Sequence, residues 1–273
     1  MRSGTSSKVV VVDLGASVIR AGLAGDGAPS LTVSTPTSNT AILSTLVDVI
    51  GKVRSAHGGN EVVVGCPGLI DLDGIVQKAL YIDLSGFELG GRLGRLLGLA
   101  VKVVNDANLQ AYGLLGDYRD ALFVSVGTAV GGAVLANGDV VLGHRGFAGE
   151  IGHIPLPGLT EKCPCGNVGC LDTVASGIVL ARRLGHEWWR FSESEQIDDV
   201  LSEAGHHVGA AAALLSTMLD PEAIVVAGHV VGHRAFSRSL SNSFLAAGGA
   251  AELRLFLDTW QLAAAGARQV VQR

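Results

Sequence analysis

Four potential metal ligands lie close together in the second half of the chain: His153, Cys163, Cys165 and Cys170. Three thiolates and one imidazole complete the tetrahedral shell of a structural zinc ion. The proline and glycines between the cysteines permit the tight chain reversal that such a shell needs. The alternative is that the cysteines pack as small apolar side chains, as we expect for the distant Cys66. We expect zinc, because clustered cysteines suit a metal site in a reducing compartment better than a disulfide framework.

Two carboxylates flank the predicted zinc loop. Glu150 precedes His153 by three residues, and Asp172 follows Cys170 by two. Carboxylate and imidazole groups suit hydrogen bonding to the vicinal hydroxyls of a sugar. A zinc ion would hold these groups in place through the loop that carries them. The alternative is that Glu150 and Asp172 are solvated surface charges.

A polar segment, Asn105-Asp106-Ala107-Asn108, follows an apolar strand and precedes a helical pattern. The Asp106 carboxylate could accept a proton from a hydroxyl nucleophile. The alternative is an ordinary helix cap, because Asn and Asp are favoured at helix N-termini. The segment by itself does not separate these two interpretations.

Glycine turns at three strand ends could bind a nucleotide, and their candidate residues are Asp13, Gly15, Ser17, Gly127, Thr128, Gly131 and Gly228. In the first turn, Ser17 and backbone amides could cradle phosphates while Asp13 holds Mg²⁺ directly or through water. The second turn repeats this design, so that the two turns would clamp a nucleoside triphosphate. The third turn, at Gly228, could lie against the adenosine. Each turn alone is also typical of an ordinary hairpin.

The strands that must position these turns occur twice along the chain. Val9–Leu14 and Val18–Leu23 flank the first turn, and Ala121–Val126 and Gly132–Ala136 flank the second. This internal duplication predicts an α/β protein of two similar lobes with a cleft between them. We expect an N-terminal lobe over residues 1–110 and a C-terminal lobe over 111–251. A C-terminal helix over about 252–273 is expected to pack on the first lobe.

Composition excludes several classes of protein. The 273 residues are 48% hydrophobic and 16% charged, with a net charge of −5 and no basic run, which disfavours nucleic-acid binding. No apolar stretch is long enough for a membrane span, and the polar N-terminus shows no secretory signal. We therefore expect a soluble cytoplasmic protein.

Taken together, the chain resembles the ROK family of bacterial sugar kinases and sugar-responsive repressors from Val9 to about Val231. The motifs that carry the resemblance are Asp13–Ser17, Pro67-Gly68 with Asp71 and Gly74, Asn105–Asn108, Gly127–Gly132, Ala148–His153 and Cys163–Gly177. The resemblance implies two ribonuclease-H-like lobes of the actin/hexokinase/Hsp70 superfamily. It implies Asp106 as the base, ATP with Mg²⁺, structural Zn²⁺ and a homodimer. The residues implied to bind the sugar are Gly68, Asn105, Asp106, Glu150, His153 and Asp172.

Several residues depart from the family pattern. The usual Gly-Gly-Thr of the first turn is Gly15-Ala16-Ser17, and the usual Gly-Thr-Gly of the second is Gly127-Thr128-Ala129. Asp172 stands where the family usually has glutamate. The usual Asn-Leu-…-Trp after the first sugar loop is replaced around Leu80–Leu84. The changes near the sugar favour an acceptor other than plain glucose, with amino sugars, N-acetylhexosamines and cyclitols as candidates.

The expected function is an ATP-dependent kinase that phosphorylates the primary 6-hydroxyl, or its equivalent, of a hexose, amino sugar or cyclitol. The alternative is a non-catalytic sugar-binding or regulatory protein on the same fold. Because the first predicted strand begins by Lys8, we expect no DNA-binding domain of the kind that the family's repressors carry. A zinc hydrolase is disfavoured, since a closed shell leaves no water on the metal. We also expect zinc loss to weaken sugar binding before it abolishes ATP binding.

Overall fold

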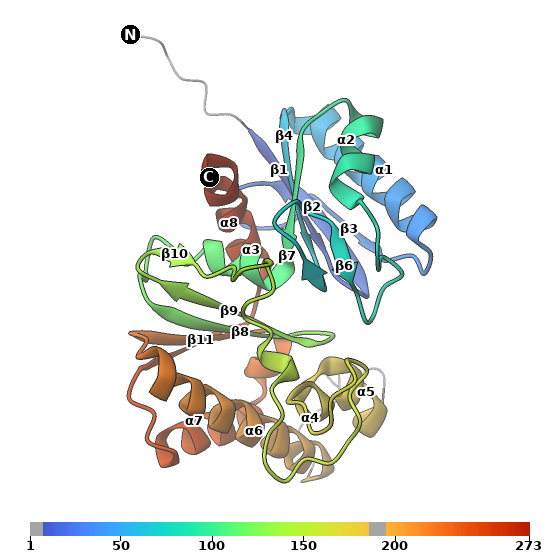
Figure 1. Ribbon diagram of the computed structural model, residues 1–273. Coiled ribbons are helices and arrows are strands. Elements are labelled where there is room, and N and C mark those ends of the chain that lie inside the picture. The colour runs from blue at the N-terminus through green and yellow to red at the C-terminus, as the bar shows by residue number, and fades with distance from the viewer. Residues whose placement is uncertain (1–7, 186–194) are drawn as a thin grey trace. The chain divides into compact units, whose positions relative to one another are not determined.

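The computed structural model describes residues 8–185 and 195–273, which form two compact units. The first unit contains the chain up to Leu114 together with residues 142–147 and 260–273. The second contains residues 115–141 and 148–259. The boundary expected after residue 110 lies inside helix α3 (Asp106–Tyr112), and the division falls just beyond the end of that helix. Figure 1 shows both units.

The first unit is built on a five-stranded sheet in the order β3-β2-β1-β4-β7. Its strands are β1 (Val9–Leu14), β2 (Val18–Leu23), β3 (Leu31–Ser34), β4 (Glu61–Cys66) and β7 (Val101–Asn105). The first three strands are antiparallel neighbours, and β1, β4 and β7 are parallel. Because the three parallel strands end at one edge of the sheet, they bring the first glycine turn, Gly65 and Asn105 to that edge. A small hairpin, β5 (Leu69–Ile70) with β6 (Val76–Lys78), follows β4.

Helices complete this unit. Helix α1 (Asn39–His57) is capped by the Ser38 hydroxyl, which accepts a hydrogen bond from the Ala41 amide. Its buried stripe recurs at helical spacing over Ile42, Leu46, Val49, Ile50 and Val53. Helix α2 (Leu89–Leu97) ends at Gly98, whose φ of 66° gives the left-handed cap that glycine favours.

The C-terminal helix, α8 (Trp260–Gln272), packs on α3 within the first unit. A glycine on each helix permits this approach, because a Cβ on Gly266 would lie 1.9 Å from the Leu109 carbonyl oxygen. In the same way, a Cβ on Gly113 would lie 2.2 Å from the Leu262 carbonyl oxygen. The helix expected to start near residue 252 is shorter than predicted, because Glu252–Phe256 forms strand β12 of the second unit.

The second unit repeats the sheet of the first, with the order β10-β9-β8-β11-β12. Its strands are β8 (Ala121–Val126), β9 (Val130–Ala136), β10 (Asp139–Val140), β11 (Ala223–Ala227) and β12 (Glu252–Phe256). The pairing β10-β9-β8 is antiparallel and β8-β11-β12 is parallel, as in the first sheet. The duplication predicted from the two hairpins is therefore confirmed, and each sheet has the ribonuclease-H-like order.

Helices α4 (Asp172–Ala175) and α5 (Gly177–Leu184) follow the cysteine loop and are separated at Ser176. Helix α6 (Glu195–Leu219) is the longest helix among the described residues. The 3₁₀ turns η1 (Ile151–His153) and η3 (His229–Gly232) and helix α7 (Arg234–Ala246) complete the unit.

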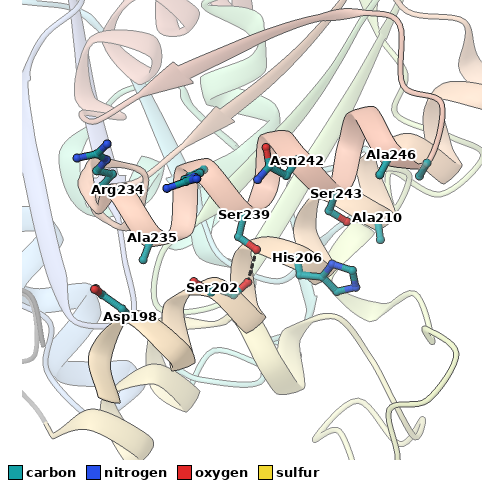
Figure 2. Close-up of a pocket in the computed structure, with 12 residues that line it drawn as sticks. Asp198, Ser202, His206, Ala210, Arg234, Ala235, Ser239, Asn242, Ser243 and Ala246 are labelled. Carbon is teal, nitrogen blue, oxygen red and sulfur yellow. Dashed lines mark hydrogen bonds between the residues drawn. The ribbon is translucent and has the colours of Figure 1, made fainter. Parts of the chain in front are cut away.

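Helices α6 and α7 pack closely because Gly205 and Gly209 face the backbone of α7. A Cβ on either glycine would lie 2.3 Å from a carbonyl oxygen of α7. A groove of about 920 Å³ runs along the two helices. Figure 2 shows the residues that line it, among them Asp198, His206 and Asn242. None of the residues that the sequence assigns to chemistry lines this groove. Across the described residues, every helix is too short or too polar to cross a bilayer.

Candidate functional site

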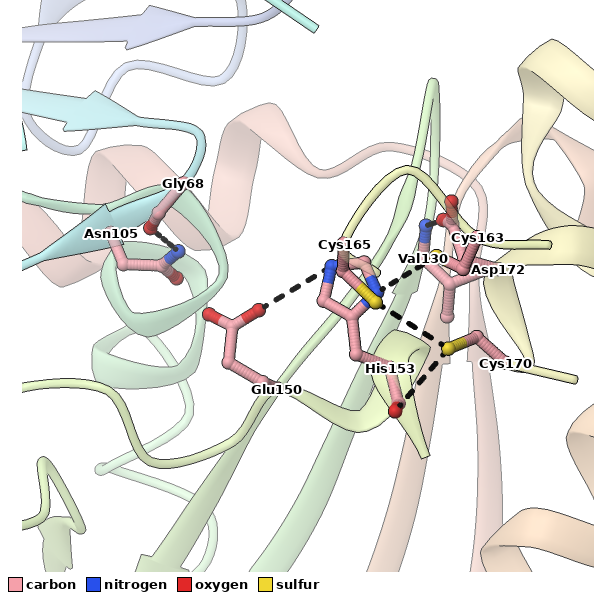
Figure 3. Close-up of polar contacts among 9 residues, drawn as sticks. All are labelled: Gly68, Asn105, Val130, Glu150, His153, Cys163, Cys165, Cys170 and Asp172. Carbon is pink, nitrogen blue, oxygen red and sulfur yellow. Dashed lines mark hydrogen bonds and ion pairs between the residues drawn. The ribbon is translucent and has the colours of Figure 1, made fainter. Parts of the chain in front are cut away.

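The four predicted metal ligands meet at one point in the second unit, as Figure 3 shows. Their ligand atoms all lie within 4.8 Å of one another. The Cys163 sulfur is 3.6 Å from Nδ1 of His153, and the Cys165 sulfur is 3.7 Å from that of Cys170. The sequence prediction that this His and three Cys residues form one cluster is confirmed by the geometry.

Short backbone contacts fold the loop around the cluster. The Cys163 amide donates to the Asn167 carbonyl, and the Gly166 amide returns to the Cys163 carbonyl. Gly169 has a φ of 74°, and a Cβ there would lie 2.4 Å from the Leu159 carbonyl oxygen. Only glycine fits that conformation and that space without strain.

The cluster has the dimensions of a tetrahedral zinc shell. Two thiolates at about 2.3 Å from a zinc ion are about 3.8 Å apart, and a thiolate and an imidazole nitrogen are about 3.5 Å apart. The distances of 3.7 Å and 3.6 Å agree with these values. Burial and the neighbouring thiols raise the pKa of Cys170 to about 12, so without a cation the thiolate form is disfavoured. A bound metal reverses that preference, and the residues present therefore fit a zinc ion.

Glu150 lies next to the metal cluster and faces its histidine ligand, His153. The His153 Nδ1 atom faces the sulfur of Cys163, which leaves Nε2 to face the Glu150 carboxylate at 4.0 Å. The Glu150 side chain is 35% exposed and that of His153 is 23% exposed. The pair is thus reachable by a ligand, and a carboxylate beside the second ring nitrogen fixes the tautomer of a metal-binding histidine.

Asp172 lies in a buried environment beside the second glycine turn. It is 1% exposed, and its Oδ1 accepts a hydrogen bond of 2.7 Å from the Val130 amide (Figure 3). Val130 begins β9, directly after the second glycine turn. Asp172 therefore ties the helix that follows the cysteine loop to this turn, a contact that the sequence analysis missed.

The second glycine turn, Gly127–Ala129, is held by the start of α5. The amides of Gly177 and Ile178 donate to the carbonyls of Gly127 and Thr128 at 2.8 and 3.1 Å. Gly228 lies against the same region, because a Cβ there would be 2.1 Å from the Val126 carbonyl oxygen. The structure thus brings Gly127, Thr128 and Gly228 together, with Gly131 on the return strand.

The residues that depart from the family pattern in the two turns are not strained. Among the described residues, the only non-glycine residues with positive φ are Asn137 and Asp220. Ala16, Ser17 and Ala129 therefore occupy conformations that any side chain adopts. In the first turn the Gly15 amide bonds the Val18 carbonyl, and the Thr35 hydroxyl bonds the Gly15 carbonyl.

Asp13 is not a free carboxylate. Arg20 lies directly opposite it in the β1–β2 register, and the Arg20 Nε donates to the Asp13 Oδ2 at 3.0 Å. A terminal guanidinium nitrogen of Arg20 bonds the same oxygen. Sequence analysis overlooked Arg20, although counting outward from the hairpin turn places residues 13 and 20 opposite each other.

The start of α3 holds the candidate base. Asn105 caps the helix, because its Oδ1 accepts from the Asn108 amide at 3.0 Å. Its Nδ2 donates to the Gly68 carbonyl at 3.0 Å (Figure 3). The cap interpretation is thus correct for Asn105, whose side chain fixes Asp106 and Gly68 relative to each other. Gly65 lets α3 approach β4, since a Cβ there would be 2.7 Å from Leu109 and 3.4 Å from the Asp106 Cα.

The environment of Asp106 suits proton transfer near neutral pH. Burial and the negative charge of Asp13 raise its pKa to about 7, against the opposing effect of the Ala107 amide that donates to its Oδ1 at 2.9 Å. A base works best when its pKa lies near the operating pH. The nearby Cys66 is fully buried, as predicted for a core thiol, and burial raises its pKa well above the usual range.

Comparison with known proteins places this arrangement in a family. The sequence profile of the ROK family matches residues 9–255, so the chain belongs to the ROK family. A glucokinase from Halalkalibacterium halodurans is 33% identical over 226 residues, which cover 69% of this chain and 68% of that protein. A DNA-binding transcriptional dual regulator, NagC, from Escherichia coli is 28% identical over 190 residues, covering 60% of this chain and 47% of the regulator.

The fold is also that of solved ROK proteins. A crystal structure of a ROK family glucokinase from Streptomyces griseus, in complex with glucose and AMPPNP, superimposes with a TM-score of 0.84. The match covers 97% of this chain and 99% of that one, at 23% sequence identity. The predicted actin/hexokinase/Hsp70 fold with two ribonuclease-H-like units is therefore confirmed.

Proposed function

We propose that this protein is an ATP-dependent sugar kinase in which Asp106 accepts the proton of the attacking hydroxyl. The observation that carries the proposal is the Asp106 carboxylate, fixed at the start of α3 with a pKa raised to about 7. A purely structural cap needs no such shift, and Asn105 already supplies the cap. The glucokinase relative supports the same reaction class.

The sugar is assigned to Gly68, Asn105, Asp106, Glu150 and His153. The Glu150 carboxylate and Nε2 of His153, which faces it, offer an acceptor and a second polar group to neighbouring hydroxyls. Asn105 holds the Gly68 carbonyl and the start of α3, so it acts by positioning Asp106 as well. Asp172 is assigned to the support of the second glycine turn, because its buried carboxylate is bonded to the Val130 amide.

ATP is assigned to the two glycine turns, through Gly15, Ser17, Gly127, Thr128 and Gly131, with Gly228 beside the adenosine. A bound Mg²⁺ would neutralise the phosphate charge that develops during transfer, as in phosphoryl transfer generally. The four-residue cluster of His153, Cys163, Cys165 and Cys170 is assigned to a structural zinc ion. Most of the rate then comes from orientation of the hydroxyl and from charge neutralisation.

An ADP-release assay tests the proposal with glucose, amino sugars, N-acetylhexosamines and cyclitols as acceptors. We expect sugar-dependent ADP release that Asp106→Asn reduces by about 10²–10⁴-fold, the usual contribution of general base catalysis. Sugar affinity should survive in the same variant, because the amide keeps the shape of the carboxylate. Turnover that Asp106→Asn leaves undiminished would contradict the assignment.

A sugar-binding regulator is the second candidate, and the NagC relative and the engaged Asp13 carboxylate favour it. A pure sugar binder would gain thermal stability from its sugar and none from nucleotide. We expect the melting temperature to rise with ADP and Mg²⁺ as well as with the accepted sugar. Stabilisation by sugar alone would select the regulator.

A further inference from the structure

Asp13, the carboxylate that the sequence assigns to Mg²⁺, is bound by the guanidinium group of Arg20. Arg20 donates from Nε and from a terminal nitrogen to the same Oδ2 of Asp13. The side chains are only 20% and 8% exposed, so water screens their attraction weakly. Charge-assisted bonds of this kind are about twice as strong as neutral ones.

The surroundings hold the two side chains in register. Asp13 and Arg20 are directly paired across β1 and β2, so the backbone keeps the two side chains within reach of each other, and Arg20 can leave Asp13 only by rotation of its side chain. On its other side Asp13 pairs with Gly65, which has no side chain to offer. Arg20 therefore lies beside the first glycine turn, where the nucleotide phosphates and their metal ion are assigned.

A divalent cation and the Arg20 guanidinium would both bind the carboxylate oxygens of Asp13. Mg²⁺ takes oxygen ligands at about 2.0–2.1 Å in near-octahedral geometry, and it gives up its water reluctantly. Coordination through Oδ2 would put two cations on one oxygen that already accepts two hydrogen bonds. Coordination through Oδ1 would still place a divalent cation on the carboxylate that the Arg20 guanidinium holds, and the two positive charges would repel each other. A metal ion at Asp13 is therefore favoured only when Arg20 gives way.

We propose that Arg20 and the divalent cation compete for Asp13, so that Asp13 is not a metal ligand while Arg20 is bound to it. This inference rests on the proposed function, because the competing cation is the one that accompanies the nucleotide. Arg20 is a positioning residue in this scheme. It keeps the Asp13 carboxylate paired in the free protein and sets the concentration of divalent cation that the nucleotide site requires.

A double-mutant cycle in the full chain tests the competition, with Mn²⁺ as the probe and ADP at saturation. The fraction of free Mn²⁺ is read from its electron paramagnetic resonance signal, which is independent of turnover. We expect Arg20→Met to tighten Mn²⁺ binding about ten- to a hundredfold, because charge-assisted hydrogen bonds no longer have to be broken. Asp13→Asn should change the affinity less than about twofold when Arg20 is present, yet remove the whole gain when Arg20 is absent.

Arg95→Met is the matched control, because Arg95 forms an exposed ion pair with Glu88 on α2. It should leave Mn²⁺ affinity unchanged. If Arg20→Met unfolds the protein, as circular dichroism would show, Arg20→Gln removes the charge while keeping a hydrogen-bond donor and should show the same gain.

The outcomes separate this inference from the proposed function. Equal weakening by Asp13→Asn in both backgrounds would mean that Asp13 binds the metal with Arg20 in place, and the competition would be refuted. An Arg20→Met variant with unchanged or weaker Mn²⁺ affinity would refute it too. Failure of ADP to bind the wild-type protein with any cation would overturn the proposed function and this inference with it.

Discussion

Replacement of Asp172 distinguishes a residue that contacts sugar from one that supports the nucleotide turn. Its Oδ1 accepts a 2.7 Å hydrogen bond from the Val130 amide in a site with 1% exposure. Asp172→Ala leaves this amide without its acceptor, and a hydrogen bond to a charged group contributes about 1.5–3 kcal/mol. Asp172→Asn keeps an oxygen at the same place and should cost less.

The expected loss is large enough to measure by thermal unfolding. For a domain of about 150–250 residues, 1 kcal/mol lowers Tm by about 2–4 °C, so Asp172→Ala should lower it by about 3–12 °C. Calorimetry should resolve this decrease, with Asp172→Asn between the variant and the wild type. Thr173→Ala is the control, because the Thr173 hydroxyl bonds the Cys170 carbonyl in the same turn without touching Val130.

Ligand affinities then decide the role of Asp172. We expect Asp172→Ala to weaken ADP binding more than sugar binding, because the lost contact anchors the strand that leaves the second glycine turn. Isothermal titration of both ligands gives the comparison. A variant that loses sugar affinity while ADP binds as in the wild type would refute the support role and restore the sugar contact that the resemblance implies.

Three further predictions concern the base, the metal and the packing of helices. The value of kcat/KM should fall as the pH is lowered, with a midpoint near pH 7, because protonated Asp106 cannot accept a proton and its pKa is raised to about 7. A midpoint at the ordinary carboxyl pKa of about 4 would contradict this. A chelator that removes bound metal should lower Tm and release zinc, which a colorimetric indicator detects, and Cys165→Ser should have the same effect. A protein that contains no zinc would refute the assignment. Gly266→Ala should destabilise the first unit by about 1–3 kcal/mol in urea unfolding, because its Cβ would meet the Leu109 carbonyl at 1.9 Å. Gly51→Ala in α1, where the Cβ meets nothing within 4 Å, should instead be neutral or stabilising.

Features that depend on neighbouring residues could be predicted from the sequence. The strands β1, β2, β8 and β9 follow from apolar runs around glycine turns, and their repetition revealed the duplicated sheet. The metal cluster could be predicted because all four ligands lie within one short segment of chain. Local spacing alone brings such ligands together, whatever the rest of the fold does.

Contacts between distant segments could not be predicted in this way. The bond between Asp172 and Val130 joins residues 42 positions apart, and nothing in the local pattern of either residue indicates it. Sequence analysis predicted that the C-terminal helix packs on the first unit, but it did not identify α3 as the partner, because the close approach at Gly266 of α8 and at Gly113 after α3 is not visible in the spacing. Arg20 is an intermediate case, since the register of the hairpin already places it opposite Asp13.

The chain segments on either side of the cysteine loop determine how the loss of the metal should affect sugar and ATP binding. On one side lie His153, in η1, and Glu150, which directly precedes η1; both are assigned to the sugar. On the other side, Cys170 is followed after one residue by Asp172, which holds the start of β9 behind the second glycine turn. Sequence analysis assigned both Glu150 and Asp172 to the sugar and therefore predicted that sugar binding fails before ATP binding. Because the second connection is a buried, charge-assisted hydrogen bond whereas the Glu150–His153 contact is partly exposed, a disordered cysteine loop should weaken both ligands together.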